Sequence, residues 1–594
     1  MRYLSKSDFT STRDCITKLY FRKQGYPSSS DNPFMDSLAR IGHIVGFLAK
    51  VKFAEGSELS MDDGVESAVL ATKKWIEENE SGVLFEATFS HMGRVARVDV
   101  LKKLGNRLEV IEVKSSGFDP TLAGRDALVQ EKSLKSKLID LAFQTTIVER
   151  AMSDFEIQPS LCLLNESITN NIDGLYGRFE VVELDSNASF KNVEVKYHGD
   201  INELRNQDLL IVWPCKDSVE ALKSTIWEES QTMVAVMDSI DDFERFRSPR
   251  KMGCSSCEYR KMDEEPNRNG FAQCWGDDAY SEPHIFSIRR DAGLAKALNP
   301  LVAEGLARMD KVPDEILIGD SGPRVFGIPI LQKNGVKEHL AGEVSQIINQ
   351  LSYPLFFVDF EAIQAPIPYH VGMKPFRSMV LFQWSCHKIS HLGAEVQHFE
   401  YLNIEPSLPN DRFIRELKNV VGNEGTFLSW SSYENTQLRN YLTNLGTDST
   451  VDSDLVNWLK SILKEKDGGY RQLDLHDDLV KKYYYHHKMG SKTSIKYVLP
   501  AILSEGQPVE NILLLKNAGL YKEAANGGLV DPYKLLPGVR GGTEAMQAYD
   551  EMIYGRGASD LNFRNLKSRE LLAYCGLDTL SMVLIFNYLK AKAL

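Results

Sequence analysis

The stretch RVARVDVLKKLGNRLEVIEVK, residues 94–114, contains two runs with the pattern of β-strands. In the first run apolar residues alternate with polar ones, Asp99 among them, which is typical of a strand with one buried face. The second run ends in Glu-Val-Lys, so Glu112 and Lys114 are two residues apart and point to the same face. Asp99 and Glu112 lie on consecutive runs, and their carboxylates can therefore meet across neighbouring strands.

Two carboxylates held together favour a hard divalent cation such as Mg²⁺ or Mn²⁺. Such a cation lowers the pKa of bound water and neutralises a phosphate oxygen. Lys114 would hold the nucleophilic water or the scissile phosphate. Taken alone, a Glu-Val-Lys tripeptide is more often an ordinary solvated sheet face, so the interpretation depends on the elements around it.

Those elements predict an α/β domain. Residues 83–89 have the pattern of a further strand. Residues 64–78 and 134–152 are predicted amphipathic helices, and in the second helix apolar residues recur at helical spacing.

The ordered set, with RIGH at 40–43 before the strands and AFQ at 142–144 on the following helix, resembles the PD-(D/E)XK nucleases of the RecB type. It is close to the CRISPR-associated RecB-like exonucleases. The resemblance implies a restriction-endonuclease-like fold and a bound Mg²⁺ or Mn²⁺. It also implies that Asp99 and Glu112 are metal ligands and that Lys114 is the catalytic lysine.

The same resemblance assigns two residues on flanking helices. His43 would ligate the metal or position water. Gln144 would be the glutamine of the family's Q-x-x-x-Y helix, although Val148 stands where the tyrosine would be. This departure affects the helix motif and leaves the metal ligands unchanged.

Cysteines outside this set suggest a second metal. Cys254 and Cys257 form a C-x-x-C, and Cys274 follows after sixteen residues. These are three ligands, one short of a tetrahedral zinc or iron–sulfur site, and Cys15 can supply the fourth. The surroundings of Cys15 resemble those of the first cysteine in iron–sulfur RecB-like nucleases, which implies a 4Fe–4S cluster. The long gap before Cys274 departs from that family, so Zn²⁺ and unligated thiols stay open.

Basic residues flank the C-x-x-C, among them Arg245, Arg247, Arg250 and Lys251. Beside a site that cleaves phosphodiesters, such a run predicts a groove that follows a nucleic-acid backbone. A solvated face accounts for the run equally well.

A second acidic set lies in the C-terminal part of the chain. Asp359 and Glu361 are two apart in a buried strand and so share a face. Tyr574 and Asp578 are four apart, which places them one turn apart on a helix. Two divalent ions about 3.5–4 Å apart, held by such carboxylates, would clamp the attacking and leaving oxygens of a phosphoryl displacement. A tyrosine hydroxyl one turn away can orient the attacking water.

This set resembles the DEDD exonucleases, which have a DnaQ-like, RNase H-like fold. The resemblance implies that Asp359, Glu361 and Asp578 are metal ligands and that Tyr574 orients water. The second motif of the family supplies an aspartate, where this chain offers Glu434 at the start of a helix. Asp474 is the alternative to Glu434.

Longer segments, among them YPLFFVDFEAIQAPIP and LLAYCGLDT, resemble a bacterial family of uncharacterised proteins that joins the two nuclease types. The expected organisation is a RecB-like domain over residues 1–280, a connector over 281–348 and a DEDD-type domain over 349–594. The expected fold class is α/β in both domains.

Composition agrees with a large globular protein. The 594 residues include 69 Lys plus Arg and 82 Asp plus Glu, a net charge of −13, which argues against a tail-driven nucleic-acid binder. The N-terminus has no apolar region typical of a secretion signal, and no stretch approaches the about 18 uninterrupted apolar residues of a transmembrane helix. The expected location is therefore cytoplasmic.

The sequence therefore predicts a metal-dependent nuclease with two active sites, acting on DNA from single-stranded ends, in DNA repair or in defence against foreign DNA by analogy. RNA is a possible substrate, and protein partners are unknown. Two alternatives stay open. One is a nucleic-acid-binding scaffold in which one or both sites are degenerate, and the other is a nuclease restricted to RNA or short oligonucleotides.

Overall fold

The computed structural model describes residues 3–29, 33–59, 64–185, 192–237, 241–265, 268–319, 322–445, 452–463, 471–525 and 527–593. The protein is a mixed α/β chain with several sheets. It divides into two compact units. Unit 1 comprises Met1–Pro249, Glu258–Cys274 and Gln364–Ser378, and unit 2 comprises Arg250–Cys257, Trp275–Ile363 and Met379–Leu594.

This division differs from the expected one in where the connector belongs. Residues 281–348 are part of unit 2, because strand β12 (Glu338–Leu340) pairs antiparallel with β18 (Tyr484–His486). Arg289 adds a hydrogen bond of 3.1 Å from Nη1 to the carbonyl oxygen of Tyr484. The supposed connector is therefore structural sequence of the C-terminal unit.

A short segment after the first acidic motif of the C-terminal part belongs to unit 1. In Gln364–Ser378, the carbonyl oxygen of His370 accepts a hydrogen bond of 2.9 Å from Nδ2 of Asn170. The rings of Tyr369 and Tyr176 lie 4.9 Å apart. These contacts tie the segment to unit 1.

Unit 1 is built on a sheet in the order β2-β3-β4-β5-β6-β9, with β1 paired to β4. The pairs β3–β4, β4–β5 and β6–β9 are antiparallel, and β5–β6 is parallel. Its strands are β1 (Leu4–Ser5), β2 (Ser57–Glu58), β3 (Ser81–His91), β4 (Arg94–Leu104), β5 (Arg107–Phe118), β6 (Glu156–Asn165) and β9 (Leu210–Pro214), with a separate hairpin of β7 (Phe179–Asp185) and β8 (Asn192–Tyr197). Its helices are α1 (Lys6–Thr12), α2 (Thr17–Lys23), α3 (Pro33–Lys52), α4 (Val65–Glu78), α5 (Gly124–Ser133), α6 (Lys135–Ala151), α7 (Ile201–Asn206), α8 (Lys216–Met237) and α9 (Gly270–Trp275).

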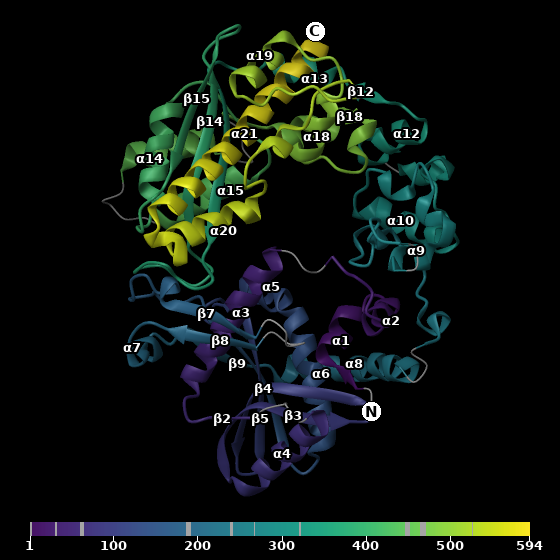
Figure 1. The fold of residues 1–594 in the computed structure, drawn as a ribbon, viewed down its shortest axis with the longest axis vertical. Helices are drawn as coiled ribbons and strands as arrows, with labels where there is room; N and C mark the ends of the chain where they lie inside the picture. The colour runs from purple at the N-terminus through teal and green to yellow at the C-terminus, as the bar shows by residue number, and fades with distance from the viewer. Residues whose placement is uncertain are drawn as a thin grey trace. The chain divides into compact units, whose positions relative to one another are not determined.

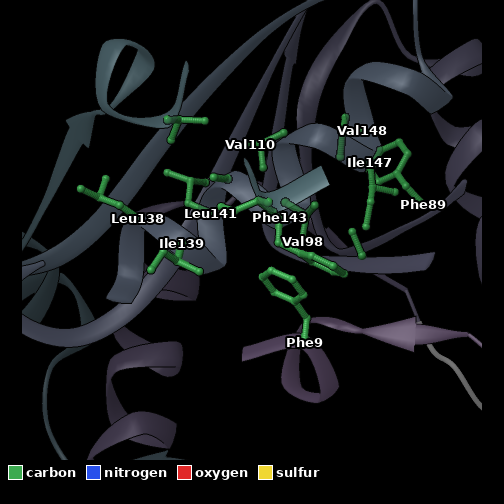
Figure 2. Close-up of a cluster of buried hydrophobic side chains, with 14 of the residues drawn as sticks. Phe9, Phe89, Val98, Val110, Leu138, Ile139, Leu141, Phe143, Ile147 and Val148 are labelled. Carbon is green, nitrogen blue, oxygen red and sulfur yellow. The ribbon is translucent and has the colours of Figure 1, made fainter. Parts of the chain in front are cut away.

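Helix α6 organises the core of unit 1. It packs on β3, β4, β5 and β6 and also against α8, so it is buried nearly all round rather than along the single stripe of an amphipathic helix. Phe143 of α6 stacks on Phe9 of α1 with ring centroids 4.8 Å apart. Figure 2 shows these rings among the apolar side chains of the sheet and helix, which include Phe89, Val98, Val110, Leu138, Ile139, Leu141, Ile147 and Val148.

Unit 2 is built on a five-stranded sheet in the order β15-β14-β13-β16-β17. The pairs β13–β16 and β16–β17 are parallel, and β14–β15 is antiparallel. Its strands are β10 (Ile318–Gly319), β11 (Gly322–Pro323), β12, β13 (Leu355–Gln364), β14 (Met379–Ile389), β15 (Val396–Leu402), β16 (Thr426–Ser429), β17 (Gln472–Asp474) and β18. Its helices are α10 (Ala292–Ala303), α11 (Asp314–Leu317), α12 (Ile328–Lys333), α13 (Glu343–Asn349), α14 (Asn410–Val421), α15 (Tyr433–Leu445), α16 (Ser453–Ile462), α17 (Lys481–Tyr483), α18 (Ile495–Leu503), α19 (Val509–Asn517), α20 (Gly542–Ile553) and α21 (Leu561–Ala593).

Strand β13 presents different residues to its two faces. Phe356, Val358 and Phe360 belong to one apolar cluster with residues of α14 and α16. Phe357, on the opposite face, packs edge-on against Phe586 of α21 with ring centroids 5.4 Å apart. Figure 1 shows α21, in yellow, lying along β14 and β15. Because side chains alternate, the odd-numbered residues of β13 face α21.

Most regular elements lie where the sequence predicts them. The structure confirms helices at α4, α6, α15 and α21 and strands at β3, β4, β5 and β13. Among the described residues α21 is long and apolar enough to cross a membrane by length and composition, and 78% of its most apolar stretch is buried inside the structure. That burial matches the core helix of a soluble protein.

Candidate functional site

Three carboxylates of unit 2 converge between β13 and α21. One oxygen each of Asp359, Glu361 and Asp578 lies within 4.8 Å of the others. Glu361 and Asp578 are buried, and Asp359 is partly buried. We call these three side chains the acidic triad.

Local structure explains the convergence. Asp359 and Glu361 alternate out of the apolar cluster on β13, so both point toward α21. Asp578 lies on the buried part of α21, one turn after Tyr574. Two neighbouring positions on one face of β13 and one position on α21 therefore form the triad, although Asp578 is distant in sequence from Asp359 and Glu361.

Crowding and burial raise the pKa values of the triad. Burial, followed by the charges of Asp578, Glu434 and Glu361, raises the pKa of Asp359 well above its usual value. Burial and Asp578 raise the pKa of Glu361 to about 8. The pKa of Asp578 is raised by burial to about 6, because hydrogen bonds from tyrosines and a nearby lysine oppose the shift. These shifts favour the protonated forms of the three carboxyl groups.

Two tyrosines and a lysine border the triad. Tyr533 donates a hydrogen bond to Oδ1 of Asp578. Nζ of Lys496 lies 3.4 Å from Oη of Tyr574 and 4.9 Å and 5.3 Å from the ring centroids of Tyr574 and Tyr533. Lys496 lowers the pKa values of Glu361 and Asp578, so it is a positive charge inside an otherwise acidic site.

The two candidates for the fourth acid differ in their partners. Asp474 accepts backbone hydrogen bonds of 2.9 Å from His476 and from Asp477, so it caps the turn that follows β17. Glu434 is 2% exposed, and within the described part of the chain its Oε2 has no hydrogen-bond partner. Burial, opposed by backbone hydrogen bonds and assisted by Asp474, raises the pKa of Glu434 to about 8. Of these two acids, Glu434 is therefore the one with a buried carboxylate oxygen that lacks a hydrogen-bond partner among the described residues.

The donor set fits a hard divalent cation. Carboxylate oxygens are the ligands of Mg²⁺ and Mn²⁺. A cation would remove the repulsion that raises the pKa values of Glu361 and Asp359 and would give the buried oxygen of Glu434 a partner. The residues present therefore suit the metal that the sequence predicts at this place.

In unit 1, Asp99 and Glu112 lie just beyond the end of the β4–β5 ladder, whose final pair in this direction is Val100 with Ile111. Oδ2 of Asp99 accepts a hydrogen bond of 2.7 Å from the backbone N–H of Val113. Burial and the charge of Glu112 raise the pKa of Asp99 to about 8. The two carboxylates are thus neighbours, as the strand pattern predicts.

Two lysines contact the carboxylate of Glu112, the second acid of this site. Lys6 donates a hydrogen bond to Oε1 of Glu112, and Nζ of Lys114 lies 2.9 Å from the same oxygen and 2.6 Å from Oδ2 of Asp140. Burial opposes ionisation of Glu112, but Lys6 and Lys114 outweigh it and lower its pKa. Among the described residues Oε2 of Glu112 has no hydrogen-bond partner, so one oxygen stays available for a cation.

Two further residues of the RecB-like set lie on helices. Gln144 is fully buried on α6 and donates a hydrogen bond of 2.9 Å to the carbonyl oxygen of Arg97 on β4. Gln144 thus joins the helix to the strand that carries Asp99. His43 has an exposed side chain on α3, and in the described ranges no third ligand atom joins Asp99 and Glu112 within 4.8 Å.

The predicted cluster cysteines differ in burial from the others. Cys15, Cys254, Cys257 and Cys274 are partly buried, whereas the remaining four cysteines are buried. Cys15 and Cys274 belong to unit 1, and Cys254 and Cys257 belong to unit 2, so the four-cysteine cluster stays a prediction. Partly buried thiols suit 4Fe–4S or Zn²⁺ equally.

Acids neighbour the arginines among the predicted nucleic-acid-binding cations. Arg245 lies 3.4 Å from Asp242 and Arg247 lies 3.2 Å from Glu244, in nitrogen–oxygen distances. Arg250 lies 2.7 Å from Asp278. These ion pairs reduce the positive charge that this segment offers to a phosphate backbone, and Lys251 is the fourth cation of the set.

Sequence reasoning missed several residues of both sites. Asp140 precedes Gln144 by one helical turn, so its spacing could have pointed to it. Lys6, Lys496 and Tyr533 carry no such signal, because each reaches its carboxylate only through the tertiary fold.

One comparison with known proteins gave a match, and it covers most of this site. A domain of unknown function, DUF2779, matches residues 356–494, a range that includes Asp359, Glu361 and Glu434. Neither the curated proteins nor the solved structures gave a match. The chain is therefore similar to DUF2779 over these residues.

Proposed function

We propose that this protein is a metal-dependent nuclease that hydrolyses phosphodiester bonds of DNA. The observation that supports it most strongly is the acidic triad, in which Asp359, Glu361 and Asp578 crowd within 4.8 Å beside an unpartnered oxygen of Glu434. Such a cluster is costly without a cation, and carboxylate-held divalent ions are suited to phosphoryl displacement.

The residues of unit 2 have distinct parts in this reaction. The triad and Glu434 would hold the cations, which lower the pKa of water and neutralise charge on the phosphate. Tyr574, held at its hydroxyl by Lys496, orients the attacking water. The resemblance to DEDD exonucleases with an RNase H-like fold supports hydrolysis from the 3′ end of a single strand.

The site of unit 1 is proposed as a second nuclease centre of the PD-(D/E)XK, RecB-like type. Asp99 and Glu112 would hold Mg²⁺ or Mn²⁺, and Lys114 would position the water or the phosphate. Gln144 keeps β4 and α6 together. A 4Fe–4S or zinc site formed by the four partly buried cysteines would stabilise the protein by closing a long loop.

The test is degradation of end-labelled single- and double-stranded DNA and RNA with Mg²⁺ or Mn²⁺, on protein purified without oxygen. Wild type, Lys114→Ala and Asp359→Asn are compared. If each variant loses a different product ladder, both centres are nucleases. If one variant has no effect, the corresponding centre has another role.

Two other functions have specific motivations. Glu434 in place of an aspartate and Val148 in place of a tyrosine suit a degenerate nuclease that serves as a nucleic-acid-binding scaffold. Wild type that shifts DNA in a gel but leaves every substrate intact would favour that scaffold. A nuclease restricted to RNA or short oligonucleotides would degrade only those members of the substrate panel.

A further inference from the structure

A cavity of about 390 Å³ opens in unit 2. Its volume is within the ~300–1,000 Å³ of typical small-ligand pockets. The residues that decide its chemistry are Phe326, Asn435, Gln472, Asp474, Lys481 and Lys482.

The cavity adjoins the candidate metal centre. Asp474 lines it and contributes to the raised pKa of Glu434, and Asn435 directly follows Glu434. Asp474 ends β17, and its partner in the neighbouring parallel strand is Ser429. The cavity therefore lies at the carboxyl ends of two parallel strands, the edge of an α/β sheet where ligands bind.

An exposed aromatic ring borders the cavity. Phe326 is 57% exposed, although burying a phenylalanine is ordinarily favourable. Val325 and Phe326 both have left-handed backbone conformations, with φ of 50° and 58°. Such conformations are strained for residues other than glycine and cluster at functional sites. The fold thus holds an aromatic face at the mouth of the cavity.

A buried amide on the cavity wall has an unused hydrogen-bonding atom. Gln472 is 7% exposed, and its Nε2 lies 3.2 Å from Oγ of Ser429. Over the residues that the structure describes, Oε1 of Gln472 has no hydrogen-bond partner. An aromatic ligand with an N–H donor on the edge of its ring would give Oε1 of Gln472 a hydrogen bond.

The charges in the cavity are nearly balanced. Lys481 lies 3.2 Å from Asp477, and Lys482 lies 3.5 Å from Asp478. With Asp474 also present, the cavity does not attract a phosphate as a cationic pocket would. It suits a flat, neutral, polar ring.

We propose that this cavity binds an unpaired nucleobase of a single-stranded nucleic acid whose backbone passes the acidic triad. Phe326 stacks on the base, and Gln472 accepts a hydrogen bond from its edge. This inference names the substrate class of the proposed nuclease and rests on that function. It also gives a role to residues 281–348, which supply Phe326.

The test measures binding of a fluorescein-labelled single strand, as DNA and as RNA, by anisotropy in Ca²⁺ to the full-length protein. The same strand with abasic residues is the matched ligand. Loss of base stacking predicts that Phe326→Ala binds the intact strand about 5- to 100-fold more weakly and the abasic strand as wild type does. Phe326→Trp keeps the affinity, and Gln472→Leu weakens binding of the intact strand alone.

Tyr280→Ala, which removes another exposed ring of unit 2, controls for loss of a surface aromatic and leaves affinity unchanged. Equal binding of intact and abasic strands by wild type, no effect of Phe326→Ala, or no binding of any single strand overturns the inference. If base-dependent binding is present but no hydrolysis occurs with Mg²⁺ or Mn²⁺, the proposed reaction fails and the base site stands. If hydrolysis is normal and Phe326→Ala changes nothing, the base site alone fails.

Discussion

Carboxylate oxygens of Asp359, on β13, and Asp578, on α21, lie within 4.8 Å of each other. Two carboxylates at this separation repel when both are ionised, and the charge of Asp578 raises the pKa values of Asp359 and Glu361. The fold of unit 2 therefore maintains an arrangement that is unfavourable without a cation. This relationship underlies the first three predictions.

Removing one acid of the triad should leave the metal-free protein at least as stable as wild type and should abolish hydrolysis by unit 2. Asp359→Asn relieves repulsion, so the melting temperature in EDTA should stay the same or rise, while metal-dependent hydrolysis by unit 2 falls more than about 100-fold. Differential scanning calorimetry and a product-ladder assay measure the two effects. Glu416→Gln, at an exposed position of α14, should change neither, and a large drop in the melting temperature of Asp359→Asn would contradict the account.

Stability of the metal-free protein should fall as pH rises from about 4.5 to about 8. Glu361 has a folded-state pKa raised from 4.5 to about 8, so in this window the folded state binds more protons than the unfolded state. A divalent cation replaces those protons, and Mg²⁺ should therefore raise the melting temperature more at pH 8.5 than at pH 5.5. An equal Mg²⁺ effect at both pH values would contradict a cation site at the triad.

Replacing Lys496 should shift the pH dependence of hydrolysis. Lys496 lowers the pKa values of Glu361 and Asp578, so Lys496→Met raises them and moves the acidic limb of the pH–rate profile upward by about one unit. Lys496→Arg keeps the charge and should restore the limb. Lys492→Met, at an exposed position nearby in sequence, is the control. If the pH–rate profile of Lys496→Met falls in height without moving along the pH axis, Lys496 has a structural role.

In unit 1, the two lysines on Glu112 should have unequal effects. Lys114 contacts Glu112 and Asp140 and lies on β5, the strand that also carries Glu112. Lys114→Ala should therefore abolish hydrolysis by unit 1, which produces the ladder that remains in Asp359→Asn. Lys6→Met should reduce that ladder by about 10-fold, because Lys114 still lowers the pKa of Glu112. Lys135→Met, exposed on α6, should have no effect, and an unchanged ladder in Lys114→Ala would exclude the proposed centre.

The cysteine cluster makes a separate prediction. Protein purified without oxygen should contain about four iron and four sulfide per chain for 4Fe–4S, or one zinc for the alternative. Cys257→Ser and Cys15→Ser should lose the metal together and lower the melting temperature. Ser256→Ala, between the two cysteines of the C-x-x-C, should retain it. Full metal content in Cys15→Ser would remove that residue from the cluster.

Local patterns were sufficient for most of the fold. Helix α4 and strand β4 lie where periodicity predicts them, because their buried residues recur at a helical spacing and at alternate positions of the strand. Ten residues of α6 between Leu138 and Val148 are buried, because the helix packs between the sheet and α8. A sequence pattern with one apolar stripe does not predict burial all round the helix. Periodicity is equally silent on where residues 281–348 pack, because β12 pairs with β18 across a long stretch of chain.

The candidate sites show the same limit. Glu112 and Lys114, or Asp359 and Glu361, are two residues apart on a strand, so the sequence alone places each pair on one face. The approach of Asp578 to β13 was expected from a family resemblance and not from spacing. Lys6, Lys496 and Phe326 enter their sites through long-range packing, and a single sequence carries no pattern for such contacts.

Titration of Mn²⁺ into the metal-free protein at pH 8, followed by electron paramagnetic resonance, measures whether the acidic triad binds a divalent cation. The comparison is wild type against the double variant Asp359→Asn plus Asp578→Asn, with Glu416→Gln as the control. The double variant should lose the Mn²⁺ bound at the triad, and the control should bind Mn²⁺ as wild type does. Equal Mn²⁺ binding by wild type and the double variant would contradict this prediction.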